Sequence, residues 1–195
     1  MSLFLSMAAF ALAMSISPGP VNIVALSAGA RYGVRASMRH VSGATIGFTA
    51  LLILVGLGLH EVLVRWQGLT LAIRFGGVAF LLYMAYKLAR DDGQLSAVEG
   101  GKGPSFLQGA AMQWLNPKAW LASVAGMGAF VANGDVPLLL QFALIYFVIC
   151  YLSVGSWAVA GGFLRRHLSE PGKVRLFNRG MAALLAASAF YLLWG

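Results

Sequence analysis

SMAAFALAMSISPGPVNIVALSAGA (Ser6–Ala30) is an apolar stretch of the chain that contains no charged residue. A run of this length is typical of a helix that crosses a membrane, which needs about 20 mostly apolar residues. However, Pro18, Gly19 and Pro20 lie in its middle. Proline removes a backbone donor and disfavours helical geometry in the residue before it. The stretch therefore predicts a membrane-spanning helix that is broken near its centre.

The composition of the whole chain indicates a membrane protein. Of its 195 residues, 59% are hydrophobic and 10% are charged, whereas soluble domains average about 25% charged residues. A soluble protein of this length needs a larger polar surface, and a lipid bilayer removes that need. The net charge of +8 does not indicate nucleic-acid binding, because the basic residues fall in short clusters between apolar runs.

Six apolar runs are long enough to cross a membrane. They are Leu3–Ala28, Val41–Leu59, Leu69–Leu88, Phe106–Val131, Pro137–Leu164 and Phe177–Trp194. The one long polar connection, residues 91–105, divides the chain into halves 1–90 and 106–195 with three runs each. Because three is odd, the second half starts on the opposite side of the membrane, and similar halves would form an inverted repeat. The sequence therefore predicts one all-α, polytopic membrane domain over residues 1–195.

The basic residues alternate between connections. Eleven of the 14 lie in or beside the first, third and fifth connections, namely Arg31, Arg35, Arg39, Lys87, Arg90, Lys102, Arg165, Arg166, Lys173, Arg175 and Arg179. Connections rich in Lys and Arg stay on the cytoplasmic side. We therefore expect the odd-numbered connections to be cytoplasmic and both termini to lie on the other side.

A second break, in WLNPKAW, lies within the fourth run at Asn116-Pro117-Lys118. Each break falls in the first run of its half, an arrangement that marks the binding site in inverted-repeat transporters. Ser17 and Asn116 both precede a proline and are both favoured N-caps, so we expect each to begin a second half-helix. Free amides at such an end bind a carboxylate, and freed carbonyls accept from an ammonium group. A single proline would instead favour a plain packing kink.

Lys118 lies near the centre of the fourth run, where an ammonium group costs at least roughly 2.5–3.5 kcal/mol. Three roles are open to it: pairing with a substrate carboxylate, carrying a proton, or binding backbone carbonyls as a structural contact. Asn22 and Gln113 lie about one turn from the breaks. The candidate binding residues are Ser17, Pro18, Gly19, Pro20, Asn22, Gln113, Asn116, Pro117 and Lys118.

No pattern in the sequence indicates a metal site or catalysis. Cys150 is the only cysteine, and His40, His60 and His167 lie at the ends of runs rather than in a cluster. We expect no cofactor and no metal, and we interpret Cys150 as a packing residue. Gly43 and Gly47, four residues apart, predict close helix packing.

SISPGPVN and GAAMQWLNPKAWL resemble the two hallmarks of the lysine-exporter (LysE/RhtB) family, a Pro-Gly-Pro in helix one and an Asn-Pro-Lys in helix four. The resemblance implies proton-driven export of amino acids across the bacterial inner membrane. In that membrane the termini, which the basic connections place away from the cytoplasm, would be periplasmic. It implies functional roles for both motifs. Many members carry Pro-Gln-Phe near the end of helix four, whereas this chain has Gly128-Ala129-Phe130, which is closer to the cysteine and O-acetylserine exporter branch.

These observations together predict a secondary transporter that exports a small, neutral amino acid or derivative by proton antiport with alternating access. The sequence offers no deep Asp or Glu to neutralise a cationic substrate side chain. A channel and a non-transporting membrane scaffold remain alternatives, and a membrane-embedded enzyme is less favoured. A homo-oligomer is compatible with the sequence.

Overall fold

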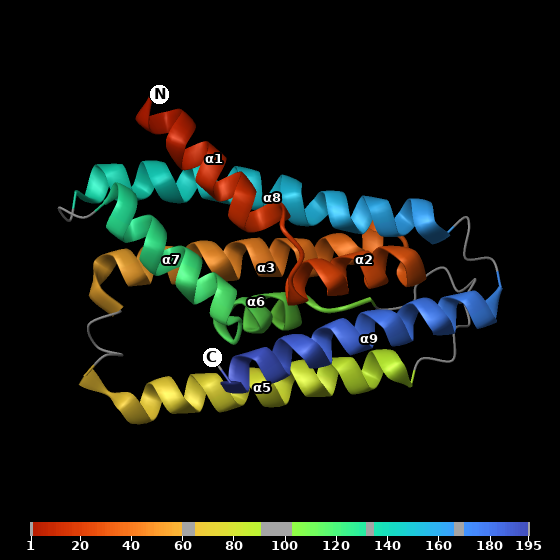
Figure 1. Ribbon diagram of the computed structural model, residues 1–195. Helices are drawn as coiled ribbons and strands as arrows, with labels where there is room; N and C mark the ends of the chain where they lie inside the picture. Colours follow the sequence, from red (N-terminus) through yellow and green to blue (C-terminus); the bar gives the residue numbers. More distant parts are fainter. Residues whose placement is uncertain (1, 60–64, 91–102, 132–134, 166–169, 195) are drawn as a thin grey trace.

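The structure is a computed structural model, and it describes residues 2–59, 65–90, 103–131, 135–165 and 170–194. Within these ranges every regular element is helical (Figure 1), so the all-α prediction is confirmed. In chain order the elements are α1 (Leu3–Ile16), α2 (Pro20–Tyr32), α3 (Val34–Leu54), the π-helical turn η1 (Val55–Leu59), α5 (Gln67–Ala89), α6 (Phe106–Trp114), α7 (Pro117–Phe130), α8 (Val136–Arg165) and α9 (Pro171–Trp194). Most of the polar connection predicted at residues 91–105 lies outside the described residues.

The helices follow the apolar runs and extend beyond some of them. For example, α3 begins at Val34 rather than Val41, and α9 begins at Pro171 rather than Phe177. Arginine and lysine are good helix formers, so a helix continues past the apolar segment that a bilayer would bury. By length and hydropathy, Val34–Gly58 and Val136–Leu164 can each span a membrane, and the bent pair α1–α2 is a third candidate.

The first break separates α1 from α2, whose axes differ in direction by 61°. The predicted N-cap is wrong, because Gly19 rather than Ser17 caps α2 and Pro20 is the first helical residue. Each proline disfavours helical geometry in the residue before it, so both Ser17 (ψ 143°) and Gly19 (ψ 172°) are extended. Ser17 is instead the C-cap of α1, and its hydroxyl donates to the carbonyl of Ala13 at 2.7 Å.

The second break separates α6 from α7 and agrees with the prediction. Asn116 is the N-cap of α7, and its side-chain oxygen accepts from the backbone N–H of Lys118 at 3.1 Å. Pro117 follows at the first helical position, where its missing N–H costs nothing. The cap and the proline together account for the helix start.

Helices α3 and α8 form the centre of the bundle. Helix α8 packs against α1, α2 and α3. Helix α3 also packs against α6, and α5 pairs with α9 along one side (Figure 1). The close packing predicted for two glycines is confirmed at the α3–α6 contact: a Cβ on Gly43 would overlap the backbone of Phe106, and one on Gly47 would lie 2.7 Å from the Cα of Ala110. Glycine therefore sets the separation between α3 and α6.

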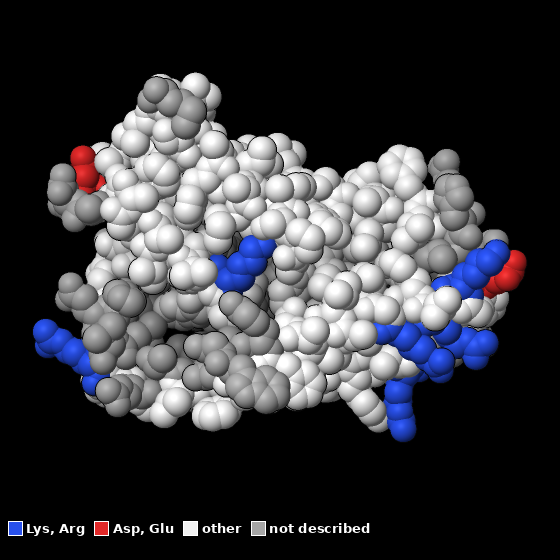
Figure 2. Space-filling model, viewed as in Figure 1, with Lys and Arg blue, Asp and Glu red and all other residues white. Residues whose placement is uncertain are grey.

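Most of the visible Lys and Arg side chains lie at one end of the molecule, where α2 ends and α9 begins (Figure 2). We call this the basic end. The described basic residues of the helices that meet there are Arg31, Arg35, Arg39, Lys87, Arg90, Lys173, Arg175 and Arg179. The three odd connections predicted from the sequence to be basic all adjoin this end.

Candidate functional site

Lys118 joins the two helix breaks. Its ammonium group donates to the carbonyl and to the hydroxyl of Ser17, each at 2.8 Å, and lies 3.5 Å from the carbonyl oxygen of Pro18. The lysine stem crosses Gly19, where an added Cβ would lie 3.5 Å from the Cδ and Nζ of Lys118. The positive charge thus lies against the C-terminal, electronegative end of α1. In this conformation Lys118 makes the backbone contact that was one of its three predicted roles.

Asn22 joins the two sides of the first break. Its side chain is only 4% exposed, and its amide nitrogen donates to the carbonyls of Ser15 at 2.8 Å and Ser17 at 2.9 Å. The indole of Trp157 on α8 donates to the carbonyl of Ile16 at 3.0 Å. Protein donors therefore already bind the carbonyls that the break frees, which removes the cost of unpaired backbone at membrane depth. The sequence had suggested a substrate ammonium group for that role.

The first amides of α2 and α7 differ in their hydrogen bonding. At α7, the side chain and carbonyl of Asn116 accept the first N–H groups of the helix. At α2, Gly19 offers no side-chain cap, and the N–H groups of Val21 and Asn22 have no acceptor within the described part of the chain. The first N–H groups of α2 are therefore open, whereas those of α7 are satisfied.

The open end of α2 and Lys118 both border a central cavity of about 40 Å³. A cavity of this size holds about three water molecules, which is less than the volume of a whole amino acid. The predicted residues that line it are Gly19, Asn22, Gln113, Asn116 and Lys118.

The other predicted site residues do not line the central cavity. Ser17 and Pro18 lie next to it, where they contact the ammonium group of Lys118. Pro20 and Pro117 occupy the first positions of α2 and α7, so they shape the breaks without facing the cavity. Their contribution is to the backbone geometry.

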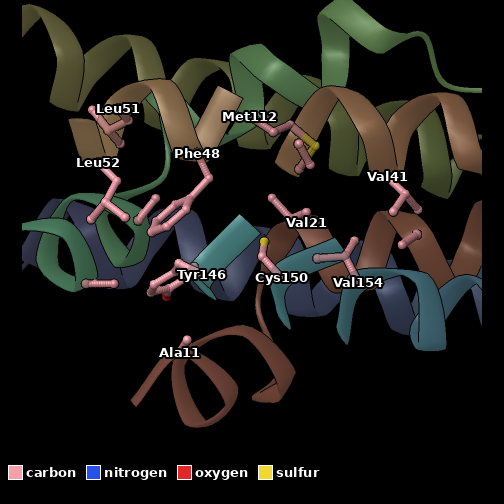
Figure 3. Packing of buried hydrophobic residues seen from close by; sticks show 14 of the residues in the cluster. Ala11, Val21, Val41, Phe48, Leu51, Leu52, Met112, Tyr146, Cys150 and Val154 are labelled. Atoms are coloured by element: carbon pink, nitrogen blue, oxygen red, sulfur yellow. The ribbon is translucent and has the colours of Figure 1, made fainter. Parts of the chain in front are cut away.

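The opposite wall comes from residues that the sequence did not single out as a site. Tyr146 and Cys150 of α8 line the cavity together with Phe48 of α3 (Figure 3). Cys150, interpreted from the sequence as a packing residue, is buried and also borders the cavity. A spacing of four residues places Tyr146 and Cys150 on one helix face. Because α8 is apolar all round, nothing in its sequence indicates which face meets the breaks.

Ser15 adds a polar group to this wall. It is 8% exposed, and its hydroxyl lies beside the Tyr146 phenol and the Cys150 thiol. It meets hydrogen-bond geometry with none of the described residues. A buried hydroxyl without a partner costs about 1–3 kcal/mol. A polar solute or water in the cavity would offset that cost.

Phe48 and Tyr146, which line the cavity, belong to a larger aromatic cluster. The ring centroids of Phe48 and Tyr146 are 4.3 Å apart, and those of Tyr146 and Phe142 are 5.8 Å apart. Phe130 of α7 extends the cluster, with its ring centroid 5.2 Å from that of Phe142 and 5.6 Å from that of Phe10. The cluster links α1, α3, α7 and α8.

Comparison of the amino-acid sequence with known proteins identifies its family. The LysE type translocator model matches residues 12–195 of the chain. The chain belongs to the LysE-type translocators. The cysteine/O-acetylserine efflux protein of Klebsiella pneumoniae subsp. pneumoniae is 26% identical over 182 residues, which cover 92% of this chain and 91% of that protein. The protein of the same name from Escherichia coli K12 is 27% identical over 183 residues, 92% of each chain. No solved structure matches the chain.

This LysE-type translocator is accordingly a membrane transport protein and not an enzyme. The predicted family resemblance is confirmed. Its relatives are bacterial efflux proteins, and together with the apolar helices this indicates a multi-pass protein of the bacterial inner membrane. Within the described residues no group of His, Cys, Asp or Glu is arranged to hold a metal ion.

Proposed function

We propose that this translocator exports a small, neutral amino acid or derivative in exchange for a proton. The observation that carries the proposal is that Val21 and Asn22, whose N–H groups have no acceptor among the described residues, line the same cavity as Lys118. Two amide donors beside a cation suit a carboxylate. The names of the relatives, cysteine/O-acetylserine efflux proteins, support a small neutral substrate.

In this proposal the substrate carboxylate binds at the N-terminus of α2, and its ammonium group faces the side-chain oxygens of Asn22 and Gln113. The substrate side chain points toward Ser15, Tyr146 and Cys150. The described lining of the cavity contains no acidic residue, so nothing there would neutralise a cationic side chain. The hydroxyl groups of Ser15 and Tyr146 and the thiol of Cys150 suit a substrate side chain that is short, neutral and weakly polar.

Lys118 offers a means of coupling binding to movement. In the structure its ammonium group joins α7 to the end of α1 through Ser17. A bound carboxylate competes for the same ammonium group and weakens that contact. A ligand shifts a conformational equilibrium only through contacts that differ between the states, and this exchange of partners is such a difference. Lys118 is also the basic group among the described lining residues of the cavity, so it is the candidate carrier of the exchanged proton. The proposal that a proton is exchanged comes from the family resemblance.

We further propose six spans arranged as an inverted repeat that opens alternately to either side. The packing supports the repeat, because the third elements of the halves, α3 and α8, contact each other, and so do the last, α5 and α9. In the repeat, α1 corresponds to α6 and α8 corresponds to α3. The pairs α1–α8 and α6–α3 are therefore equivalent, and both are in contact. The basic end supports cytoplasmic odd connections and periplasmic termini. The central cavity is smaller than an amino acid, so transport requires it to open.

Efflux from amino-acid-loaded cells that carry Lys118→Ala or Pro18→Ala tests the site. We expect Lys118→Ala to lower efflux at least about tenfold, because a charged hydrogen bond contributes about 1.5–3 kcal/mol. Pro18→Ala lets Ser17 relax toward helical geometry and should reduce efflux as well. Lys173→Ala is the matched control, since Lys173 lies at the surface with Glu170. Wild-type efflux in both site variants at equal protein levels would contradict the site.

The same assay separates the transporter from the alternatives. A channel would pass substrate down its gradient without any dependence on a pH gradient, and a scaffold would pass none. The mass of the detergent-solubilised complex tests whether the protein forms a homo-oligomer, which stays a prediction.

A further inference from the structure

Ser15, in the last turn of α1, has a hydroxyl group that its own helix does not use. A serine inside a helix can donate to the carbonyl four residues earlier, as Ser188 does to Leu184 at 2.9 Å. The hydroxyl of Ser15 has no hydrogen-bond partner among the described residues, although the residue is only 8% exposed. Because Ser15 lines the central cavity, its hydroxyl is available to a molecule bound there.

The position of Ser15 at the central cavity distinguishes it from two other buried serines. Ser27 is 5% exposed and Ser123 is 0% exposed, and the hydroxyls of both also lack a partner among the described residues. Neither of them lines the central cavity. A buried hydroxyl without a partner therefore does not mark a binding site by itself, and the case for Ser15 rests on its combination with the cavity.

The backbone of Ser15 is tied to the proposed carboxylate position. Its carbonyl accepts from the side-chain amide of Asn22 at 2.8 Å, and Asn22 carries one of the two open N–H groups of α2. On the other side, the hydroxyl of Ser15 lies beside the phenol of Tyr146 and the thiol of Cys150. The sulfur of Cys150 accepts from the hydroxyl of Thr45 at 4.0 Å. The hydroxyl of Ser15 is thus held between the open amides and the polar wall of α8.

We propose that Ser15 determines specificity by hydrogen bonding to an oxygen or sulfur atom at the γ position of the transported amino acid. The inference rests on the proposed function, which places the substrate carboxylate at α2 and its side chain toward Ser15. A γ atom is close to the carboxylate, and the small size of the cavity favours such a short side chain. An apolar side chain of the same size would leave the hydroxyl buried and unpaired, so the site should reject it.

Competition between two amino acids of nearly the same size tests this inference. Serine carries a hydroxyl at the γ position, and 2-aminobutyrate carries a methyl group there. Each is added at increasing concentration to inside-out membrane vesicles that take up radiolabelled O-acetylserine. For half-inhibition of the wild-type protein we expect to need about tenfold more 2-aminobutyrate than serine, because 2-aminobutyrate leaves Ser15 unpaired. In Ser15→Ala this ratio of concentrations should fall to about one.

Ser123→Ala is the matched control, because it removes another buried hydroxyl that does not line the cavity. It should keep the wild-type ratio, and Ser15→Thr, which retains a hydroxyl, should still favour serine. An unchanged ratio in Ser15→Ala would overturn the specificity role. A wild-type ratio near one would overturn it as well, and that comparison needs no variant. Absence of O-acetylserine uptake by the wild-type protein, or uptake unaffected by Lys118→Ala, would instead overturn the proposed function.

Discussion

Gly47→Ala tests whether the contact between α3 and α6 sets the geometry at the second break. An added Cβ would lie 2.7 Å from the Cα and 3.0 Å from the carbonyl oxygen of Ala110. Carbon atoms pack best at about 3.5–4.0 Å, so α6 must move away from α3 by about 0.8 Å. The same glycine carbonyl accepts from the indole of Trp114 at 3.1 Å, next to the break. The displacement would therefore reach the α6–α7 junction.

The free-energy cost has two opposing parts. Overpacking a well-packed contact costs about 1–3 kcal/mol. Replacing glycine by alanine inside a helix contributes about 1 kcal/mol in the other direction. Gly155→Ala on α8 isolates the second part, because nothing lies within 4 Å of a Cβ at that position. Gly155→Ala should thus be neutral or stabilising, and Gly47→Ala should be less stable than it by about 1–3 kcal/mol.

Thermal unfolding of the two purified variants in the same detergent measures this difference. In a chain of this length, about 1 kcal/mol corresponds to roughly 2–4 °C in Tm. We expect Gly47→Ala to unfold several degrees below Gly155→Ala and to show reduced efflux, because Asn116 and Lys118 follow α6 directly. Equal Tm values for the two variants would refute the claim that backbone contact at Gly47 limits the approach of α6.

Two further predictions concern the first break and the cavity wall. Asn22→Leu removes both hydrogen bonds that the side-chain amide donates. The carbonyl of Ser15 is then unpaired, while that of Ser17 keeps its bond to Lys118. The free energy of unfolding should fall by about 1–3 kcal/mol, and an unchanged thermal unfolding curve would contradict this role. Cys150 is buried and lines the central cavity. A neutral amino acid substrate at saturating concentration should therefore slow the alkylation of Cys150 by a membrane-permeant maleimide severalfold, as measured by mass spectrometry. An unaffected rate would show that the substrate does not occupy this cavity.

Local features of the sequence predicted much of the fold. The apolar runs predicted the helices, since hydropathy reports directly which segments avoid water. Asn116-Pro117 predicted its helix start, because capping and the missing proline N–H act within one turn. Ser17-Pro18 did not predict the other start. There two prolines compete, and the later one determines where α2 begins.

The site itself depended on contacts between distant segments. Lys118 and Ser17 are far apart in the sequence, and only the packing of α7 against α1 brings the ammonium group to the carbonyl. Tyr146 and Cys150 belong to a helix that is apolar on every face, so only its packing against α1, α2 and α3 shows which side borders the cavity.

The sequence by itself determined that this is an all-helical membrane protein with two helix breaks, because composition and proline act locally, and its two motifs carried the family resemblance. Tertiary structure decided which freed backbone groups remain available. Donors from Asn22, Trp157 and Lys118 bind the carbonyls of the first break, and Asn116 binds the amides of α7. Whether a backbone group is free depends on every neighbour that packs near it, so only the folded chain shows that the open amides are those of α2.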